Sequence, residues 1–356
     1  MRDYEEALLN KLNENVETLT VRGVPVTVKP VPDPEGADHL DPRVHREVVD
    51  GFADEHSQQL SEPTQRARMG RANYNMNRQE IWTKYLTVDT SCGQVPVWVY
   101  YPRHLDGLRP ALLYAHGGAF KGGTPFMVEN PCRLIAERAN CVVFNIDYAL
   151  PPEHPYPVPV QQVYEVLAHV AAHAWAYHVD ASRIFAAGDS AGGNLAACCA
   201  VMDAARNTRY LAGQALIYAK LIFDNHRVQG YARDETQFTL CAEQQQYLGG
   251  LTAIGSEEAN AADARVYLQG AYDCMLPQIS PVTFARKELL PPTLLLLSEY
   301  DGLRLEGEFY ASQLQAAGVT VREVRYRGMS HGFLDRLGIY PQAEDAVNEI
   351  VRWIEG

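Results

Sequence analysis

The sequence has 356 residues, of which 47% are hydrophobic and 21% are charged. These proportions are those of an ordinary globular protein and exclude a disordered or fibrous chain. The length suits one α/β catalytic domain with insertions as well as it suits two average domains. The formal net charge is −13, without any run of Lys or Arg. Such a chain should repel nucleic acid and anionic lipid, so the expected partner is a neutral or cationic small molecule.

Neither a membrane segment nor a metal motif is visible in the sequence. No stretch approaches the roughly 20 apolar residues of a membrane span, and no apolar signal region follows the acidic start. We therefore expect a cytoplasmic protein. The seven cysteines are odd in number and include the neighbours Cys198 and Cys199, which argues against a disulfide framework. His169 and His173 are spaced to suit a metal, but no further ligand motif lies near them, so we expect no metal or cofactor.

The first 80 residues are polar and resemble helices more than strands. Apolar residues recur at helical spacing over Tyr4–Val16 and over Val44–Leu60, and the loop Pro30–Gly36 separates the two stretches. We predict that residues 1–80 form a helical cap segment rather than part of the core.

From residue 81 onward the pattern changes to strands. Ile81–Val88 and Val95–Tyr101 predict an antiparallel hairpin. Six further apolar runs alternate with helical stretches, which predicts an α/β fold over residues 81–356 with a mostly parallel, eight-stranded sheet between helices. Those six runs are Ala111–Ala115, Cys141–Ile146, Ile184–Ala187, Ala215–Tyr218, Thr293–Leu297 and Val321–Tyr326. The long connection at about residues 223–274 should carry helices that join the cap.

A run of small residues follows the strand predicted at Ile184–Ala187. Gly188 to Gly192 has the pattern G-x-S-x-G, and helical sequence follows it. In this setting a sharp turn lifts the serine into a strained, accessible position. The positive end of the helix then favours the oxyanion that forms when Ser190 attacks a carbonyl group. The alternative interpretation is a plain glycine-rich turn.

A second glycine motif, His116 to Phe120, follows the strand predicted at Ala111–Ala115. The other half of the oxyanion hole lies at this point in α/β hydrolases. Consecutive glycines let backbone N–H groups face the site without obstruction from a Cβ atom. We therefore predict Gly117, Gly118 and Ala191 as the oxyanion donors. The alternative is a glycine turn that holds a hydrogen-bonded histidine.

Together these motifs resemble those of the bacterial hormone-sensitive lipase-like (family IV) esterases of the α/β-hydrolase superfamily. The resemblance rests on residues 116–120, 147–157 and 188–194, and it covers about residues 95–333. It implies the α/β-hydrolase fold with a helical cap, and a homodimer through the last strand and the helix Ala343–Glu355. Ala119 replaces the family's third glycine, and its methyl group is expected to narrow the site for bulky alcohols.

In that family the catalytic acid and base lie late in the chain, which places them at Asp301 and His331. Both residues follow apolar strands, where the catalytic groups of α/β sheets gather, and the order Ser190, Asp301, His331 is the order expected of the fold. His331 would accept the proton of Ser190, and Asp301 would fix the tautomer of His331. Glu299 is the competing acid, but it lies too close to the end of the predicted strand.

The predicted function is that of a serine carboxylesterase that hydrolyses short-chain acyl esters through an acyl-serine intermediate. The predicted lid lacks the broad apolar surface that an interfacial lipase needs. A non-catalytic small-ligand receptor on the same fold is one alternative. A small serine peptidase or amidase is another. Receptors of this kind tend to lack the triad histidine, so the presence of His331 favours an enzyme.

Overall fold

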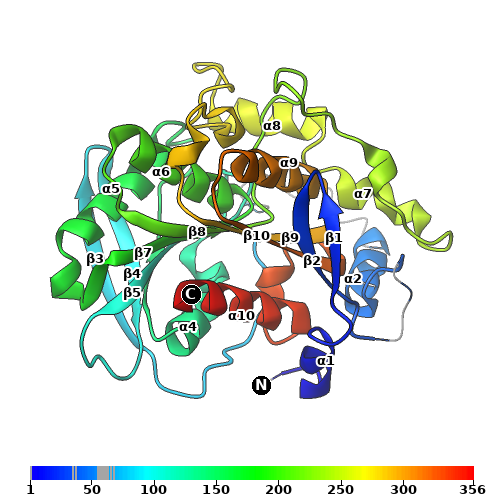
Figure 1. Cartoon of the computed structure of the whole chain (residues 1–356), viewed down its shortest axis with the longest axis horizontal. Coiled ribbons are helices and arrows are strands. Elements are labelled where there is room, and N and C mark those ends of the chain that lie inside the picture. The colour runs from blue at the N-terminus through cyan, green and yellow to red at the C-terminus, as the bar shows by residue number, and fades with distance from the viewer. Residues whose placement is uncertain (1, 34–35, 37, 54–63, 65, 67–68) are drawn as a thin grey trace.

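The protein is described from a computed structural model that covers residues 2–33, 36, 38–53, 64, 66 and 69–356 (Figure 1). In this part of the chain, ten strands form one sheet in the order β1-β2-β10-β9-β8-β7-β5-β6-β4-β3. The strands are β1 (Glu17–Val21), β2 (Val24–Lys29), β3 (Trp82–Thr90), β4 (Gly93–Tyr101), β5 (Arg109–Ala115), β6 (Val142–Ile146), β7 (Val179–Asp189), β8 (Leu211–Ile217), β9 (Thr293–Tyr300) and β10 (Val321–Ser330).

All eight predicted strands are present, as β3 to β10. The β3–β4 hairpin is antiparallel and pairs through β4 with β6 in the antiparallel sense. The pairs from β6 through β5, β7, β8 and β9 to β10 are all parallel. The strands of this parallel part run in one direction, so their carboxyl ends meet at one edge of the sheet, where the functional residues gather.

Helices cover both faces of the sheet (Figure 1). The α-helices are α1 (Glu6–Lys11), α2 (Pro42–Ala53), α4 (Glu129–Arg138), α5 (Val158–Ala172), α6 (Ala191–Arg206), α7 (Leu248–Thr252), α8 (Glu257–Tyr267), α9 (Leu303–Ala316) and α10 (Pro341–Glu355). Short 3₁₀ turns cover Pro125–Met127, Ala174–Tyr177, Glu235–Gln237, Gln245–Tyr247, Pro281–Thr283, Lys287–Leu289 and Phe333–Arg336.

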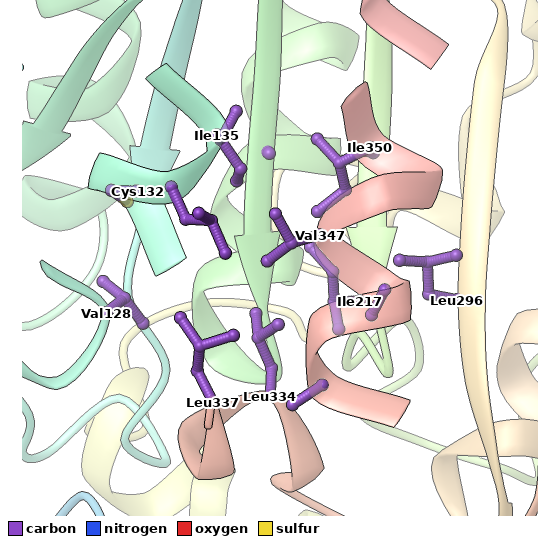
Figure 2. Packing of buried hydrophobic residues seen from close by; sticks show 14 of the residues in the cluster. Val128, Cys132, Ile135, Ile217, Leu296, Leu334, Leu337, Val347 and Ile350 are labelled. Atoms are coloured by element: carbon purple, nitrogen blue, oxygen red, sulfur yellow. The ribbon is translucent and has the colours of Figure 1, made fainter. Parts of the chain in front are cut away.

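The core lies between the sheet and these helices. On one face, α4 and α10 pack side by side, and Figure 2 shows Ile135 of α4 and Ile350 of α10 among the buried side chains there. Ile217 of β8 and Leu296 of β9 are fully buried in the same cluster. Each such side chain stabilises the fold by about 1.5–3 kcal/mol relative to an exposed one. On the other face α5, α6 and α9 complete the sandwich (Figure 1).

The N-terminal segment differs from the helical prediction. Residues 6–11 and 42–53 are helical, but β1 and β2 form a hairpin between them that extends the sheet beyond the predicted eight strands. The turn at Arg22 and Gly23 has positive φ angles of 50° and 85°, typical of a tight hairpin. Alternating Thr and Val residues around this turn were the signal that a search for helical spacing overlooked. The rest of the helix predicted over Val44–Leu60, residues 54–60, lies outside the described residues.

The hairpin also lies against the last strand, which is part of the expected dimer interface. Strand β2 pairs in parallel with β10, from the Glu323–Val26 pair to the Tyr326–Lys29 pair. The outer edge of the last strand is therefore occupied within the chain, by β2. Most residues of α10, the other predicted contact, are buried as well. The homodimer through the last strand and the helix Ala343–Glu355 stays a prediction.

The long connection after β8 contains α7 and α8 and, within residues 223–274, no strand. It contacts the N-terminal segment over the edge of the sheet that holds the strand ends. The N–H of Leu40 donates a hydrogen bond to Oε1 of Gln244 at 2.8 Å, and the rings of His45 and Tyr247 lie 5.7 Å apart. The two segments are therefore in contact, and the cap that they were expected to form stays a prediction. All seven cysteines are unpaired, and five of them are buried.

Candidate active site

Ser190 occupies the turn between β7 and α6. Its backbone angles, φ 55° and ψ −119°, are strained for a residue with a side chain. The turn is possible because three nearby residues, Gly188, Gly192 and Gly193, lack side chains. A Cβ atom on Gly188 or Gly192 would collide with main-chain carbonyl groups, and one on Gly193 would lie 2.6 Å from the Cβ of Ala219. The local sequence thus forces the hydroxyl group of Ser190 out of the sheet, at the amino end of α6.

The structure brings Ser190, His331 and Asp301 together. Nε2 of His331 lies 2.9 Å from Oγ of Ser190, and Nδ1 of His331 lies 2.7 Å from Oδ2 of Asp301. Asp301 is fully buried, and its Oδ1 accepts a hydrogen bond from the N–H of Leu303 at 2.9 Å. Glu299, the competing acid, is still within β9 and accepts a hydrogen bond from the N–H of Gly328. The geometry therefore pairs His331 with Asp301.

The surroundings of His331 set its basicity. Burial by itself lowers the pKa of this imidazole, but the charge and hydrogen bond of Asp301 raise it, and the net pKa lies above the ordinary value. The ring of Tyr218 packs edge-on against the imidazole at 4.9 Å between centroids. These contacts hold the ring in one orientation, with Nε2 directed at the serine.

The predicted oxyanion donor Gly117 is not free to act as one. Its N–H donates a hydrogen bond to Oδ1 of Asp189 at 3.1 Å, so we withdraw Gly117 from the donor set. The next two amides, of Gly118 and Ala119, donate no hydrogen bond within the described part of the chain, and the same holds for the amide of Ala191. All three residues line the cavity at Ser190. Gly118 and Ala191 therefore stay predicted donors, and the amide of Ala119 is also unbonded in this part of the chain.

Asp189 is a residue of the site that the sequence reasoning did not single out. It is 3% exposed and also accepts a hydrogen bond from the hydroxyl group of Tyr114 at 3.1 Å. Burial and the nearby charge of Asp335 raise the pKa of its carboxyl group. Its position beside Ser190 in the glycine motif was the available signal. Its contact with Gly117, 72 residues earlier in the chain, could not be read from the sequence.

His116 anchors the glycine loop. It is fully buried, its Nδ1 lies 2.7 Å from the carbonyl oxygen of Gly117, and its ring stacks on Tyr148 at 4.5 Å. Burial lowers the pKa of this histidine to about 4, so the imidazole is neutral. Neither contact involves Ser190. The motif thus contains both a hydrogen-bonded histidine, which was the alternative interpretation, and the unbonded amides of Gly118 and Ala119.

Two adjoining cavities meet at His331. The cavity that contains Ser190 has a volume of about 280 Å³, and its apolar walls include Phe120, Tyr218 and Leu303. The second cavity measures about 680 Å³ and lies between α2 and the connection that follows β8. Arg71 lines both cavities. An ester seated at Ser190 therefore has a small chamber on one side and a larger, more open one beside it.

None of the helices in the ranges described above is long and apolar enough to pass through a lipid bilayer.

Comparison with known proteins places this site in a family. The chain is 31% identical to esterase LipI of Mycobacterium tuberculosis over 268 residues. The alignment covers 74% of this chain and 78% of that protein. The chain is also 31% identical over 255 residues to carboxylesterase NlhH of the same species, with 71% of this chain and 75% of that protein covered. The structure of a hyperthermophilic esterase from Pyrobaculum calidifontis superimposes with a TM-score of 0.71 at 31% identity, covering 89% and 98%.

A family profile described as alpha/beta hydrolase fold matches residues 112–335. This range contains both glycine motifs and all three residues of the Ser190–His331–Asp301 arrangement. The resemblance to the hormone-sensitive lipase-like esterases and the predicted fold class are thereby confirmed. The chain is a member of the α/β-hydrolase family.

Proposed function

We propose that the protein is a serine carboxylesterase with Ser190 as nucleophile, His331 as general base and acid, and Asp301 as the partner that orients His331. The observation that carries this proposal is the chain of contacts from Oγ of Ser190 to Nε2 of His331 and from Nδ1 to Asp301, at 2.9 and 2.7 Å. Relatives that are 31% identical over most of this chain bear the names esterase and carboxylesterase, which supports the same activity here.

The reaction follows from acid–base need. A serine hydroxyl group is a weak nucleophile, so Nε2 of His331 removes its proton as Oγ forms a bond to the ester carbonyl carbon. When the tetrahedral intermediate collapses, the carbonyl–alkoxy bond breaks and Nε2 returns the proton to the leaving alcohol oxygen. Water then repeats the sequence on the acyl-Ser190 intermediate and releases the carboxylic acid. Asp301 stabilises the imidazolium form throughout.

For the oxyanion we propose the amides of Gly118, Ala119 and Ala191. All three line the Ser190 cavity, and none of them donates a hydrogen bond elsewhere in the described chain. The amino end of α6 adds its dipole to the stabilisation. Each donor of this kind contributes about 2.7–4 kcal/mol to the transition state in comparable enzymes.

We further propose a preference for short acyl chains, supported by the small volume of about 280 Å³ beside Ser190. A series of p-nitrophenyl esters from acetate to palmitate tests this preference. We expect kcat/KM to be highest for acyl chains of about two to six carbons, because a cavity of this volume is at the small end of small-molecule sites. A maximum at long chains would contradict it. The cytoplasmic location and a homodimer remain predictions of the sequence.

Phosphonate labelling followed by peptide mapping tests the central assignment. The wild-type protein should be labelled at Ser190 and should hydrolyse p-nitrophenyl acetate, whereas Ser190→Ala should do neither. Labelling at another residue would overturn the assignment. Absence of turnover by a folded wild-type protein would favour the non-catalytic receptor, and cleavage of amides in preference to esters would favour the peptidase.

A further inference from the structure

The cavity beside Ser190 is charged as well as small. Its lining includes six side chains that are charged, or can become charged, near neutral pH: Arg71, Asp189, Lys220, Asp263, His331 and Asp335. A charged group that faces a narrow cavity is costly unless a partner compensates it. The partners of these six groups therefore indicate what the cavity can accept.

Both permanently cationic groups have acceptors within the protein. Nζ of Lys220 donates a hydrogen bond to Oδ1 of Asn260 and lies 3.5 Å from Oε1 of the buried Glu306. Arg71 lies 3.2 Å from Oε2 of Glu47. These contacts satisfy the cations, so neither group leaves a positive charge without a partner in the lining.

The three carboxylates of the lining differ in how many hydrogen-bond donors they have. Asp189 accepts hydrogen bonds from Tyr114 and Gly117. Asp263 and Asp335 have no hydrogen bond from a side chain and no ion pair with any described residue. Asp335 is only 7% exposed, and its Oδ1 is buried without a hydrogen-bond partner. The unpartnered charges of the cavity are thus both acidic.

The environment of these two groups supports the same conclusion. Burial raises the pKa of Asp263, and the charge of Lys220 opposes this rise. Burial likewise raises the pKa of Asp335, to about 6, against the opposing charge of Arg71. Near neutral pH, Asp335 is therefore mostly ionised, although no described side chain donates a hydrogen bond to its carboxylate. A cation that enters the cavity would supply the missing partner.

We propose that the Ser190 cavity selects esters that carry an ammonium group, with Asp263 and Asp335 as the carboxylates that face it. The inference rests on the proposed esterase function and names a substrate class for it. Phe120 and Tyr218 line the same cavity and place aromatic rings in its wall, which favours a quaternary ammonium group. The net charge of −13 also draws cationic substrates toward the protein.

The ammonium group could lie on the alcohol or on the acyl side of the ester, so the test has two arms. The first compares acetylcholine with 3,3-dimethylbutyl acetate, its neutral isostere. The second compares the ethyl ester of 4-(trimethylammonio)butanoate with ethyl 5,5-dimethylhexanoate. In each arm the measured quantity is the ratio of kcat/KM for the cationic ester to that for the neutral one, at pH 8 and low ionic strength.

At least one arm should give a wild-type ratio of about 10, the effect of one compensated charge in a part-buried site. Asp263→Asn and Asp335→Asn should each lower that ratio severalfold. Raised salt should lower the ratio less than either substitution does, because charges in a partly enclosed cavity are only partly screened. The ratio divides out any general effect of a substitution on turnover. The arm that responds identifies the side of the ester that carries the cation.

Asp106→Asn is the matched control, because Asp106 is an exposed carboxylate that lines neither cavity and its loss changes the net charge equally. It should leave the ratio unchanged within about twofold, as expected of a screened surface charge. Wild-type ratios of one or less in both arms would overturn the inference, as would ratios that neither cavity variant changes. Failure to hydrolyse even the neutral esters would instead contradict the proposed esterase function.

Discussion

The N–H of Gly117 donates a hydrogen bond to Oδ1 of Asp189, 3.1 Å away, and so ties the glycine loop to the residue that precedes the nucleophile. The two segments follow different strands, β5 and β7, which are neighbours in the sheet. This contact sets the distance between the loop amides and Ser190. It gives Asp189 a positioning role, because its carboxylate holds the loop that carries Gly117.

Removing this contact should weaken catalysis without removing the nucleophile. In Asp189→Ala the N–H of Gly117 loses its acceptor, so the amides of Gly118 and Ala119 should lose their fixed position. We expect kcat to fall about 10- to 100-fold, the effect of about 1–3 kcal/mol for a buried donor left unsatisfied. Steady-state kinetics on p-nitrophenyl acetate measures the change.

Asp189→Asn is the control for this substitution. Its side-chain oxygen can still accept the hydrogen bond of Gly117, and a neutral amide is less costly to bury than a carboxylate. It should retain most of the activity that Asp189→Ala loses. Equal losses in the two variants would indicate that the charge, and not the hydrogen bond, matters.

Ala119 adopts a positive φ angle of 51°, a conformation that costs a residue with a Cβ atom about 1–2 kcal/mol. Ala119→Gly should relieve this strain, offset in part by about 0.5–1 kcal/mol of added freedom in the unfolded chain. We expect an unchanged or slightly raised Tm. Loss of the methyl group should also raise kcat/KM for tert-butyl acetate relative to ethyl acetate.

Ala119→Val provides the opposite test of the same position. A β-branched side chain tolerates positive φ poorly, so this variant should be less stable and should discriminate more strongly against tert-butyl acetate. A lower Tm for Ala119→Gly, measured by calorimetry, would show that the strain has been overestimated.

The acid limb of the pH–rate profile should depend on Asp301. His331 must be neutral to accept the proton of Ser190, so kcat/KM should rise with pH through the pKa of His331. That pKa is raised by Asp301 against the opposing effect of burial, which places the limb above about 6.5. In Asp301→Asn the two largest effects that raise this pKa are lost, and burial outweighs the smaller effect of Asp189, so the limb should move to lower pH.

The same variant should lose about 10³- to 10⁴-fold in kcat, because the tautomer of His331 is no longer fixed. Glu299→Gln is the matched control, since Glu299 bonds to the N–H of Gly328 instead. It should keep the acid limb of the wild type. A shift of the limb in Glu299→Gln but not in Asp301→Asn would mean that the two acids have been assigned the wrong way round.

Stability should fall as pH rises because of Glu323 in β10. This side chain is 1% exposed, neither carboxyl oxygen has a hydrogen-bond partner, and burial raises its pKa to about 8. A folded-state pKa above the unfolded value means that the folded protein holds the proton more tightly. The resulting stability is complete below about pH 4.3 and is lost as pH rises through 8.

Between those limits, Glu323 should lower the free energy of unfolding by up to about 1.4 kcal/mol per pH unit. Glu323→Gln cannot ionise, so its stability curve, measured by urea denaturation from pH 5 to 9, should be flatter than that of the wild type. Parallel curves for the two proteins would show that Glu323 is compensated in a way that its contacts do not reveal.

The sequence by itself determined the parts of this protein that depend on neighbours along the chain. The apolar runs of β3 to β10 predicted their strands, and the glycines around Ser190 predicted the strained turn because only small residues fit there. Asp301 and His331 could be chosen because each follows a strand whose end must reach the same edge of the sheet. A search for helical spacing failed at β1 and β2, whose signal was the period of two.

Only the tertiary structure decided the relationships between distant segments. The pairing of β2 with β10 closed the edge that a second copy was expected to use, and Asp189 took the amide of Gly117 that was expected to bind the oxyanion. The same holds for Asp263 on α8 and Asp335 in the 3₁₀ turn after β10, which line one cavity. Such contacts join residues tens to hundreds of positions apart, and their energies depend on burial, which the linear order of residues does not specify.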